Sequence, residues 1–209
     1  MIMSNTFRKA LEAGKSTIGT HFLFSDPDVA ELIGDTGLFD YAEFSAEYSI
    51  LDMRLLYHLA RAAQCSNLTL MIKLDQEGQG FWGQAALGAG FKSILFTDIR
   101  SASDIDTCHD IIRPDTPNVG GRMGLKLRRP ALSTYAPETY LEDLNSIVFC
   151  LMLEKQIAVQ NIDEILSLDF EPKKYEEKGT YHSSADLPNE IDWSSIIDDQ
   201  IQILHDYYF

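Results

Sequence analysis

The sequence predicts an α/β protein of the (β/α) barrel type, and three observations lead to this fold class. Apolar runs of strand length alternate with stretches of helix length at intervals of roughly 25 residues, as in parallel βαβ units. Several of these runs end in polar residues, as strands that build a barrel active site do. The first run is not followed by the Gly-x-Gly-x-x-Gly turn of dinucleotide-binding folds, which disfavours the alternative, a doubly wound sheet.

The first half of the chain divides cleanly into strands and helices. Phe7 to Ala13 is predicted as a short helix, closed by Gly14. Asp26-Pro27-Asp28 opens the next helix, because acidic residues and proline favour the first turn. The predicted segments that follow residue 15 are, in order, strand 16–24, helix 26–33, strand 39–48, helix 51–64, strand 68–74 and helix 80–87.

The second half continues the alternation. The predicted segments are strand 93–99, helix 102–112, a Pro/Gly-rich passage to residue 124 with a short strand near 122–125, helix 137–144, strand 147–154 and helix 159–168. Seven apolar residues from Ile147 to Leu153 run into Glu154, a pattern typical of a strand buried on both faces. A glutamate in such a setting needs a cation or donor nearby. The alternative is a strand that ends in water, with Glu154 solvated.

We expect a barrel-like domain over residues 1–168 and a separate segment over 169–209. The second segment holds ten acidic residues and three lysines. Its end, Trp193 to Tyr208, has the spacing of an amphipathic helix that begins at Asp192. A complete barrel takes about 250 residues, and the chain has 209. We therefore expect the barrel to be incomplete within one chain, with the C-terminal helix closing the gap on its own chain or a neighbour's.

Charge and composition exclude several classes of function. Lys and Arg total 17 against 32 Asp and Glu, a formal charge of −15, which disfavours nucleic acids and anionic membranes as partners. No apolar run approaches the ~18 to 20 residues of a membrane span, and the N-terminus lacks the layout of a secretory signal. Three widely separated cysteines fit reduced thiols. We expect a cytoplasmic protein.

Polar residues at the ends of the predicted strands are the candidate site. They are His21, Ser45, Glu47, Lys73, Asp75, Thr97, Asp98 and Glu154. In a parallel barrel these ends converge at one mouth. His21 titrates near neutral pH and could carry a proton there; the alternative is a buried, hydrogen-bonded histidine.

Several segments together resemble a known family. They are Phe7 through Gly14, Ile18-Gly19, Asp26 to Glu31, Phe39 through Glu47, Gly88 to Phe91, Gly121 to Gly124, Leu153-Glu154 and Val159 to Ile165. With these, the chain resembles the HpcH/HpaI aldolases, the metal-dependent class II pyruvate aldolases related to citrate lyase, over roughly residues 7 to 168. The resemblance implies a TIM-barrel-like fold of the phosphoenolpyruvate/pyruvate type.

The resemblance also implies a chemistry. Family members chelate a 2-oxo acid on Mg²⁺ or Mn²⁺ held by two carboxylates, so that an enolate is stabilised by the cation and a nearby arginine. Glu154 matches the first carboxylate, and Asp186 is the candidate for the second. The family's arginine falls on Lys73, which keeps the charge without the bidentate fork.

Other positions depart from the family pattern. The histidine base falls on Tyr48, its acid partner on Ser45, a glutamine near the metal on Met152 and a tryptophan on His21.

Two functions follow. The first is a carbon–carbon lyase or related enolate chemistry on a small 2-oxo acid or similar carboxylate, with Lys73, His21, Tyr48 and Glu47 as catalytic candidates.

The second function is a catalytically degenerate aldolase-like scaffold that serves as a binding or assembly protein. The departures from the family pattern favour it, and an ion pair between Lys73 and Glu154 in the metal's place would favour it further. Under either function the resemblance implies a homo-oligomer with exchanged C-terminal helices.

Overall fold

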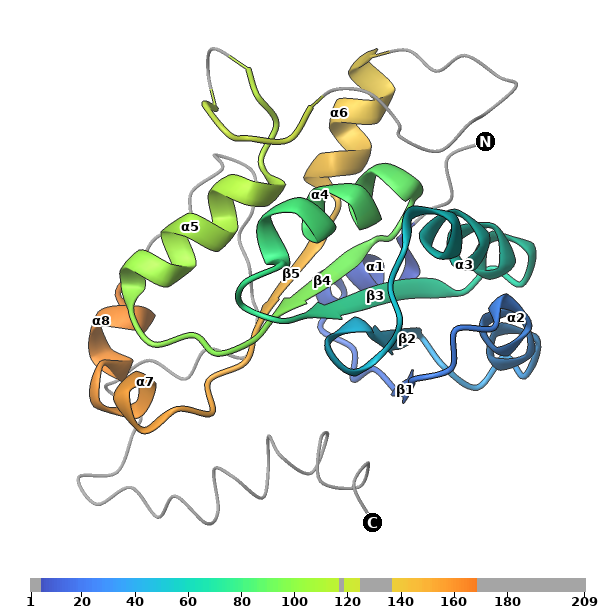
Figure 1. The fold of residues 1–209 in the computed structure, drawn as a ribbon, viewed down its shortest axis with the longest axis horizontal. Helices are drawn as coiled ribbons and strands as arrows, with labels where there is room; N and C mark the ends of the chain where they lie inside the picture. The colour runs from blue at the N-terminus through green and yellow to red at the C-terminus, as the bar shows by residue number, and fades with distance from the viewer. Residues whose placement is uncertain (1–4, 117–118, 125–136, 169–209) are drawn as a thin grey trace.

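A computed structural model describes residues 5–116, 119–124 and 137–168. Its centre is a sheet of five parallel strands in the order β1-β2-β3-β4-β5 (Figure 1). The strands are β1 (Gly19–Phe22), β2 (Tyr41–Ser45), β3 (Thr69–Leu74), β4 (Ser93–Phe96) and β5 (Val148–Leu151). Each strand lies beside the next one along the chain, whereas a doubly wound sheet reverses its strand order. The barrel-type prediction is therefore confirmed, as an open sheet in the described residues.

Helices connect the strands in sequence. They are α1 (Thr6–Glu12), α2 (Pro27–Asp35), α3 (Met53–Cys65), α4 (Gln79–Ala89), α5 (Ala102–Ile112), α6 (Pro137–Asn145), α7 (Gln156–Gln160) and α8 (Ile162–Leu166), with a short 3-10 helix, η1 (Ala46–Tyr48). Side-chain caps explain several starts, because the first N–H groups of a helix lack partners. Asp26 accepts from the backbone of Asp28, Asp52 from that of Leu55, and Ser101 forms a capping box with Asp104.

The main core lies between the sheet and α2 to α5, which cover one face of it (Figure 1). Alternate strand residues point to this outer face. Phe44 on β2, Ile72 on β3 and Ile94 on β4 are all fully buried there. Successive helices in this layer contact one another, α2 with α3, α3 with α4 and α4 with α5.

Helix α1 packs on the opposite, inner face, at the amino end of the strands. Phe7 stacks on Tyr41 of β2 with ring centroids 4.3 Å apart. A Cβ at Gly19 would lie 2.2 Å from the Tyr41 ring, so only glycine fits beneath it. The Asn5 side chain donates to the backbone oxygens of Lys92 and Ser146, which precede β4 and β5. The amino end of the inner face is therefore closed by α1.

The predicted elements agree with the structure in order and type, and the differences lie at strand ends. The five long strands predicted are each shorter in the structure, at one or both ends, and only the strand over 68–74 keeps its predicted last residue, Leu74. Helix 159–168 is two short helices, α7 and α8, joined at Asn161. Near residue 122 there is an isolated bridge between Pro114 and Met123 in place of a strand, within the described residues.

The strand predicted over 147–154 is shorter and less buried than expected, and Glu154 is solvated, as in the alternative given for it. The strand ends at Leu151, and residues 149–151 are only half-buried, because β5 is an edge of the described sheet. Glu154 lies three residues beyond the strand and its side chain is half exposed.

The boundary at residue 168 stays a prediction, since the C-terminal segment, with Asp186 and the expected helix 193–208, lies outside the described residues. None of the described helices has the length and apolar character needed to cross a membrane.

Phe44 tests the outer-face core. Phe44→Ala removes a fully buried ring beside Phe22 and leaves a cavity, so the free energy of unfolding should fall by about 3–5 kcal/mol. Urea unfolding followed by circular dichroism measures this change. Leu32→Ala, at a side chain of α2 that is 66% exposed, is the control and should cost less than about 0.5 kcal/mol. Equal losses for the two variants would contradict the assignment of this core.

Candidate active site

The inner face changes character along the strands, from apolar at its amino end to polar at its carboxyl end. In the sheet register His21 of β1 pairs with Glu43 of β2, and Ser45 of β2 pairs with Lys73 of β3. Alternation along the strands puts these four residues on the face that also carries Tyr41. We call them, together with Glu47 and Tyr48 of η1, the inner polar cluster.

Lys73 is the central cation of the inner polar cluster. The residue is only 6% exposed. Its Nζ lies 3.2 Å from Oε2 of Glu47 and 5.0 Å from the centroid of the Tyr48 ring. Both partners come from η1, which turns the chain over the end of β2 and so covers the end of β3. Tyr48 itself is 61% exposed. The amine therefore lies just beneath the surface at the carboxyl end of the sheet.

Glu43 adds a second carboxylate to this cluster. It is buried, and the Ser45 hydroxyl donates to its Oε1. Two acidic side chains, one ammonium and one imidazole thus lie on neighbouring strand ends. Such an arrangement can bind a carboxylate and move protons to and from it.

A second group of charges follows β4 and β5. Lys155 Nζ lies 2.6 Å from Oδ1 of Asp98 and 3.5 Å from Oε1 of Glu154, so one ammonium bridges two carboxylates. The hydrogen bond from Lys155 is the main cause that lowers the pKa of Asp98 below its usual value, and the same bond raises the pKa of Lys155. Asp98 has a left-handed backbone, with φ of 58°, which is uncommon for a residue other than glycine. We call Asp98 and Glu154 the carboxylate pair.

The carboxylate pair fits the metal that the family resemblance implies. Mg²⁺ commonly takes one or two protein carboxylates and completes its shell with water and substrate oxygens. Among the described residues no group of three or more His, Cys, Asp or Glu side chains has the geometry of a metal site. The fit therefore rests on Asp98 and Glu154, and Lys155 contacts both carboxylates, which leaves the group with a net negative charge.

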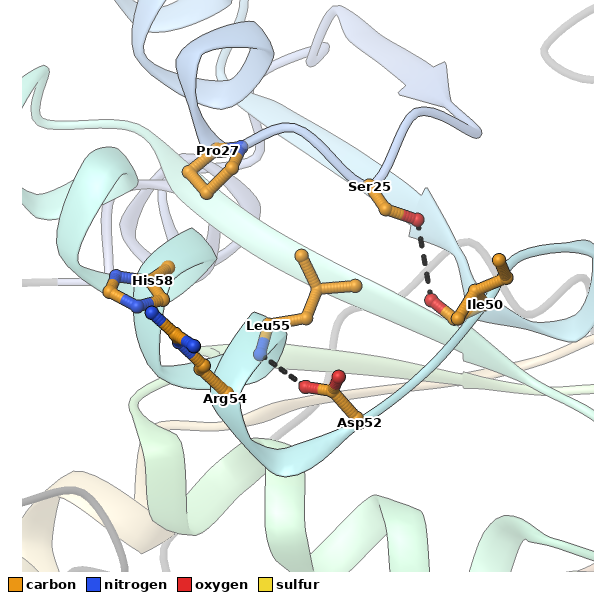
Figure 2. A pocket seen from close by; sticks show the side chains of 7 residues that line it. All are labelled: Ser25, Pro27, Ile50, Asp52, Arg54, Leu55 and His58. Carbon is orange, nitrogen blue, oxygen red and sulfur yellow. Dashed lines mark hydrogen bonds between the residues drawn. The ribbon is translucent and has the colours of Figure 1, made fainter.

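A separate hollow of about 230 Å³ lies between the loops that follow β1 and β2 (Figure 2). Its polar groups are largely engaged: Asp52 caps α3, and the Ser25 hydroxyl donates to the Ile50 backbone. Arg54 and His58, four residues apart on α3, also line it. None of the predicted catalytic or metal residues lines this hollow. It is therefore distinct from the inner polar cluster.

The sequence located most of this arrangement. Four of the predicted residues lie on neighbouring elements at the carboxyl end of the strands, as expected: His21, Glu47, Tyr48 and Lys73. Glu154 also lies at this end of the sheet, but it belongs to the second group of charges, where it pairs with Lys155.

Two participants were missed by the sequence analysis. Glu43 alternates with Tyr41 and Ser45, so the two-residue strand period could have found it. Lys155, directly after Glu154, is a cation next to the candidate carboxylate in the sequence, and the structure pairs the two at 3.5 Å although Glu154 is half exposed.

Two curated proteins are similar in sequence. A hydroxypyruvate/pyruvate aldolase of Agrobacterium fabrum is 24% identical over 197 residues, covering 93% of this chain and 70% of that protein. A hydroxypyruvate/pyruvate aldolase of Roseovarius nubinhibens is 22% identical over 166 residues, covering 79% of this chain and 63% of that protein. No family model matches the chain.

Solved structures share the fold. An HpcH/HpaI aldolase/citrate lyase family protein from Burkholderia cenocepacia has a TM-score of 0.67 at 19% identity, covering 78% of this chain and 65% of its own. An HpcH/HpaI aldolase from Desulfitobacterium hafniense has a TM-score of 0.62 at 22% identity, covering 76% of this chain and 61% of its own. The chain thus spans between three fifths and seven tenths of these relatives.

Lys73 should contribute strongly to stability because it neutralises buried acid. Lys73→Met leaves Glu47 without its cation, so the free energy of unfolding at pH 7 should fall by about 3–5 kcal/mol. The double variant Lys73→Met/Glu47→Gln should recover part of this loss. Lys155→Met, at an exposed ammonium, is the control and should change the urea midpoint little. A double variant no more stable than Lys73→Met would count against the pair.

Proposed function

Because the chain is a divergent relative of the HpcH/HpaI aldolases in sequence and fold, we propose that it is a carbon–carbon lyase that acts on a small 2-oxo acid with the help of Mg²⁺ or Mn²⁺. The two similar curated proteins are both named as aldolases of hydroxypyruvate and pyruvate, which supports a 2-oxo acid as the substrate class. Related enolate chemistry, such as decarboxylation, would use the same groups.

One observation carries this proposal: a nearly buried ammonium lies at the carboxyl end of the inner face among groups that can exchange protons. Lys73 offers its charge to an anionic substrate oxygen, and in a site shielded from water this attraction is much stronger than in solution. Glu47 holds the amine in position before the substrate arrives. Active sites in parallel barrels are built at this end of the strands.

Proton transfer would fall to the inner polar cluster. His21 lies next to Glu43 in the register of β1 and β2, and histidine is the side chain that most often serves in general acid–base catalysis. Tyr48, whose ring lies 5.0 Å from Lys73 Nζ, brings a phenol hydroxyl that would be a second proton donor. Exposed apolar side chains that follow the neighbouring strands, Phe24 and Ile50 in loops and Phe81 in the first turn of α4, would help to exclude water once a substrate is bound.

Asp98 and Glu154 would hold the divalent ion, with Asp186 as a further candidate ligand. When bound, the ion would chelate the 2-oxo acid and stabilise the negative charge that develops during bond cleavage. Lys155 would then give up its contacts to both carboxylates, because the ion competes with the ammonium for the same oxygens.

A degenerate binding or assembly scaffold is the second candidate function. The internal pair of Lys73 with Glu47 is the observation that favours it, since an ammonium already neutralised by the protein is less available to a substrate. The family's histidine base and its partner, replaced by Tyr48 and Ser45, point the same way.

Calorimetry and pyruvate release test the proposed function. Titration of Mn²⁺ with pyruvate or oxaloacetate into the wild type should release heat, and Glu154→Ala should weaken binding of the ion about tenfold or more. The wild type should also release pyruvate from a 4-hydroxy-2-oxo acid in a metal-dependent way. Glu164→Ala, at an exposed glutamate on α8, is the control. If the wild type gives no heat and releases no pyruvate, the lyase is refuted and the scaffold function is supported.

We also propose that the chain functions as a homo-oligomer in which the C-terminal segment covers a neighbour or its own barrel. The support is the edge of β1 together with large exposed apolar side chains nearby, Ile18 and Leu38. An exposed strand edge and apolar area are costly in water.

Light scattering checks this proposal. The full-length protein should be a defined oligomer, and a variant that ends at Leu168 should aggregate or lose that state, because its apolar surface stays uncovered. A monodisperse, soluble monomer from the shortened variant would refute the proposal.

A further inference from the structure

Lys155 is held much less firmly than the two buried lysines. Lys73 and Lys92 are buried, and each is paired with an acidic side chain. The Lys155 side chain is 42% exposed, and its partners Asp98 and Glu154 are 26% and 50% exposed. Ion pairs in contact with water contribute little to stability. The ammonium of Lys155 can therefore leave its two partners at small cost.

The fold does not depend on the Lys155 side chain. Residue 155 is the N-cap of α7 through its backbone, and in the part of the chain that the structure describes its side chain makes no capping hydrogen bond. A separate contact fastens the segment after β5 to the loop after β4, since the Asn161 amide donates to the backbone oxygen of Arg100, 2.9 Å away. The ammonium can therefore change position while the helix and the loop stay in place.

The other two cations at this end of the sheet are engaged elsewhere. The guanidinium of Arg100 donates to Oε1 of Gln76, 2.9 Å away in the loop after β3. Lys73 lies 3.2 Å from Glu47. Lys155 is thus the cation among these three whose own partners are the candidate metal ligands.

The charge around Lys155 changes sign when a divalent ion is present. Asp98 and Glu154 bring two negative charges and Lys155 one positive charge, so the three residues together carry one net negative charge. With a divalent ion on the two carboxylates, the same group carries one net positive charge. A 2-oxo monocarboxylate has one negative charge, so it matches this group in magnitude and is opposite in sign.

We propose that Lys155 binds the carboxylate of the 2-oxo acid once a divalent ion has taken Asp98 and Glu154. This inference rests on the proposed function, because it needs both the ion and a 2-oxo acid. Lys155 then serves two partners in turn. It pairs with the carboxylates of the protein before the ion binds, and with the carboxylate of the substrate afterwards.

The chemistry and the position of Lys155 suit this exchange. Its ammonium sits on a flexible four-carbon stem and has three donors, and its hydrogen bonds to a carboxylate are strengthened by charge. Lys73 belongs to β3 and Lys155 follows β5, so the two lysines flank β4. Neighbouring strands lie about 5 Å apart, a spacing that two long side chains bridge. One small acid can therefore meet Lys155 with its carboxylate and Lys73 with its 2-oxo oxygen.

Titration of Mn²⁺ without any acid tests the first partner of Lys155. The ion should bind Lys155→Met about tenfold more tightly than the wild type, because the ammonium no longer competes for Asp98 and Glu154. Isothermal titration calorimetry measures both dissociation constants. Lys9→Met, at an exposed lysine of α1 at the other end of the sheet, removes the same charge and should bind the ion as the wild type does.

Titration of pyruvate in saturating Mn²⁺ tests the second partner. Lys155→Met should bind pyruvate about tenfold more weakly than the wild type, because one charge-assisted hydrogen bond is lost. Lys155→Arg keeps a positive charge with several donors and should retain most of the affinity. Lys9→Met should bind pyruvate as the wild type does, and circular dichroism checks that every variant is folded.

Opposite shifts from one substitution support the proposal, since damage to the fold would weaken the binding of both ligands. An unchanged affinity of Lys155→Met for Mn²⁺ or for pyruvate overturns it. The metal-assisted lyase stands in that case, because the wild type still binds the ion and the acid. A wild type that binds neither Mn²⁺ nor pyruvate refutes the proposed function, and this role of Lys155 with it.

Discussion

The parallel register between β2 and β3 is the constraint on which the site depends. It places Ser45 beside Lys73 at the end of the two strands, and the chain that leaves Ser45 turns at once into η1. Glu47 and Tyr48 consequently reach over the neighbouring strand. A register shifted by one residue would move Lys73 to the helix-covered face, where an ammonium has no acidic partner. The charge cluster is therefore a result of strand pairing.

Two separate charge groups lie at the carboxyl end of the strands. The first surrounds a nearly buried ammonium on β3, and the second surrounds an exposed ammonium after β5. Lys73 pairs with Glu47 in the first group, and Lys155 contacts both Asp98 and Glu154 in the second. Each lysine therefore offsets part of the negative charge around it before any ligand binds. A ligand has to replace existing contacts, which favours small anions and multivalent cations over weakly charged molecules.

The order and type of elements could be predicted because each local signal agreed with the global fold. Apolar periodicity, the caps at Asp26 and Ser101, and the polar strand ends all pointed to parallel βαβ units. The pairing of charges could not be predicted, because it depends on how far the chain turns after each strand. Glu154 is the clearest case: its exposure follows from an edge strand that ends early, and no local pattern records which strand forms the edge.

Helix α1 closes the amino end of the inner face, at the end of the sheet opposite to the two charge groups. Phe7 on Tyr41 above Gly19, and Asn5 bound to the backbone before β4 and β5, hold the amino end of the strands together without any residue of the charge groups. Loops at the other end can therefore change during evolution with little effect on the core. A chain only 22–24% identical to its curated relatives can in this way keep their scaffold while its reactive groups drift.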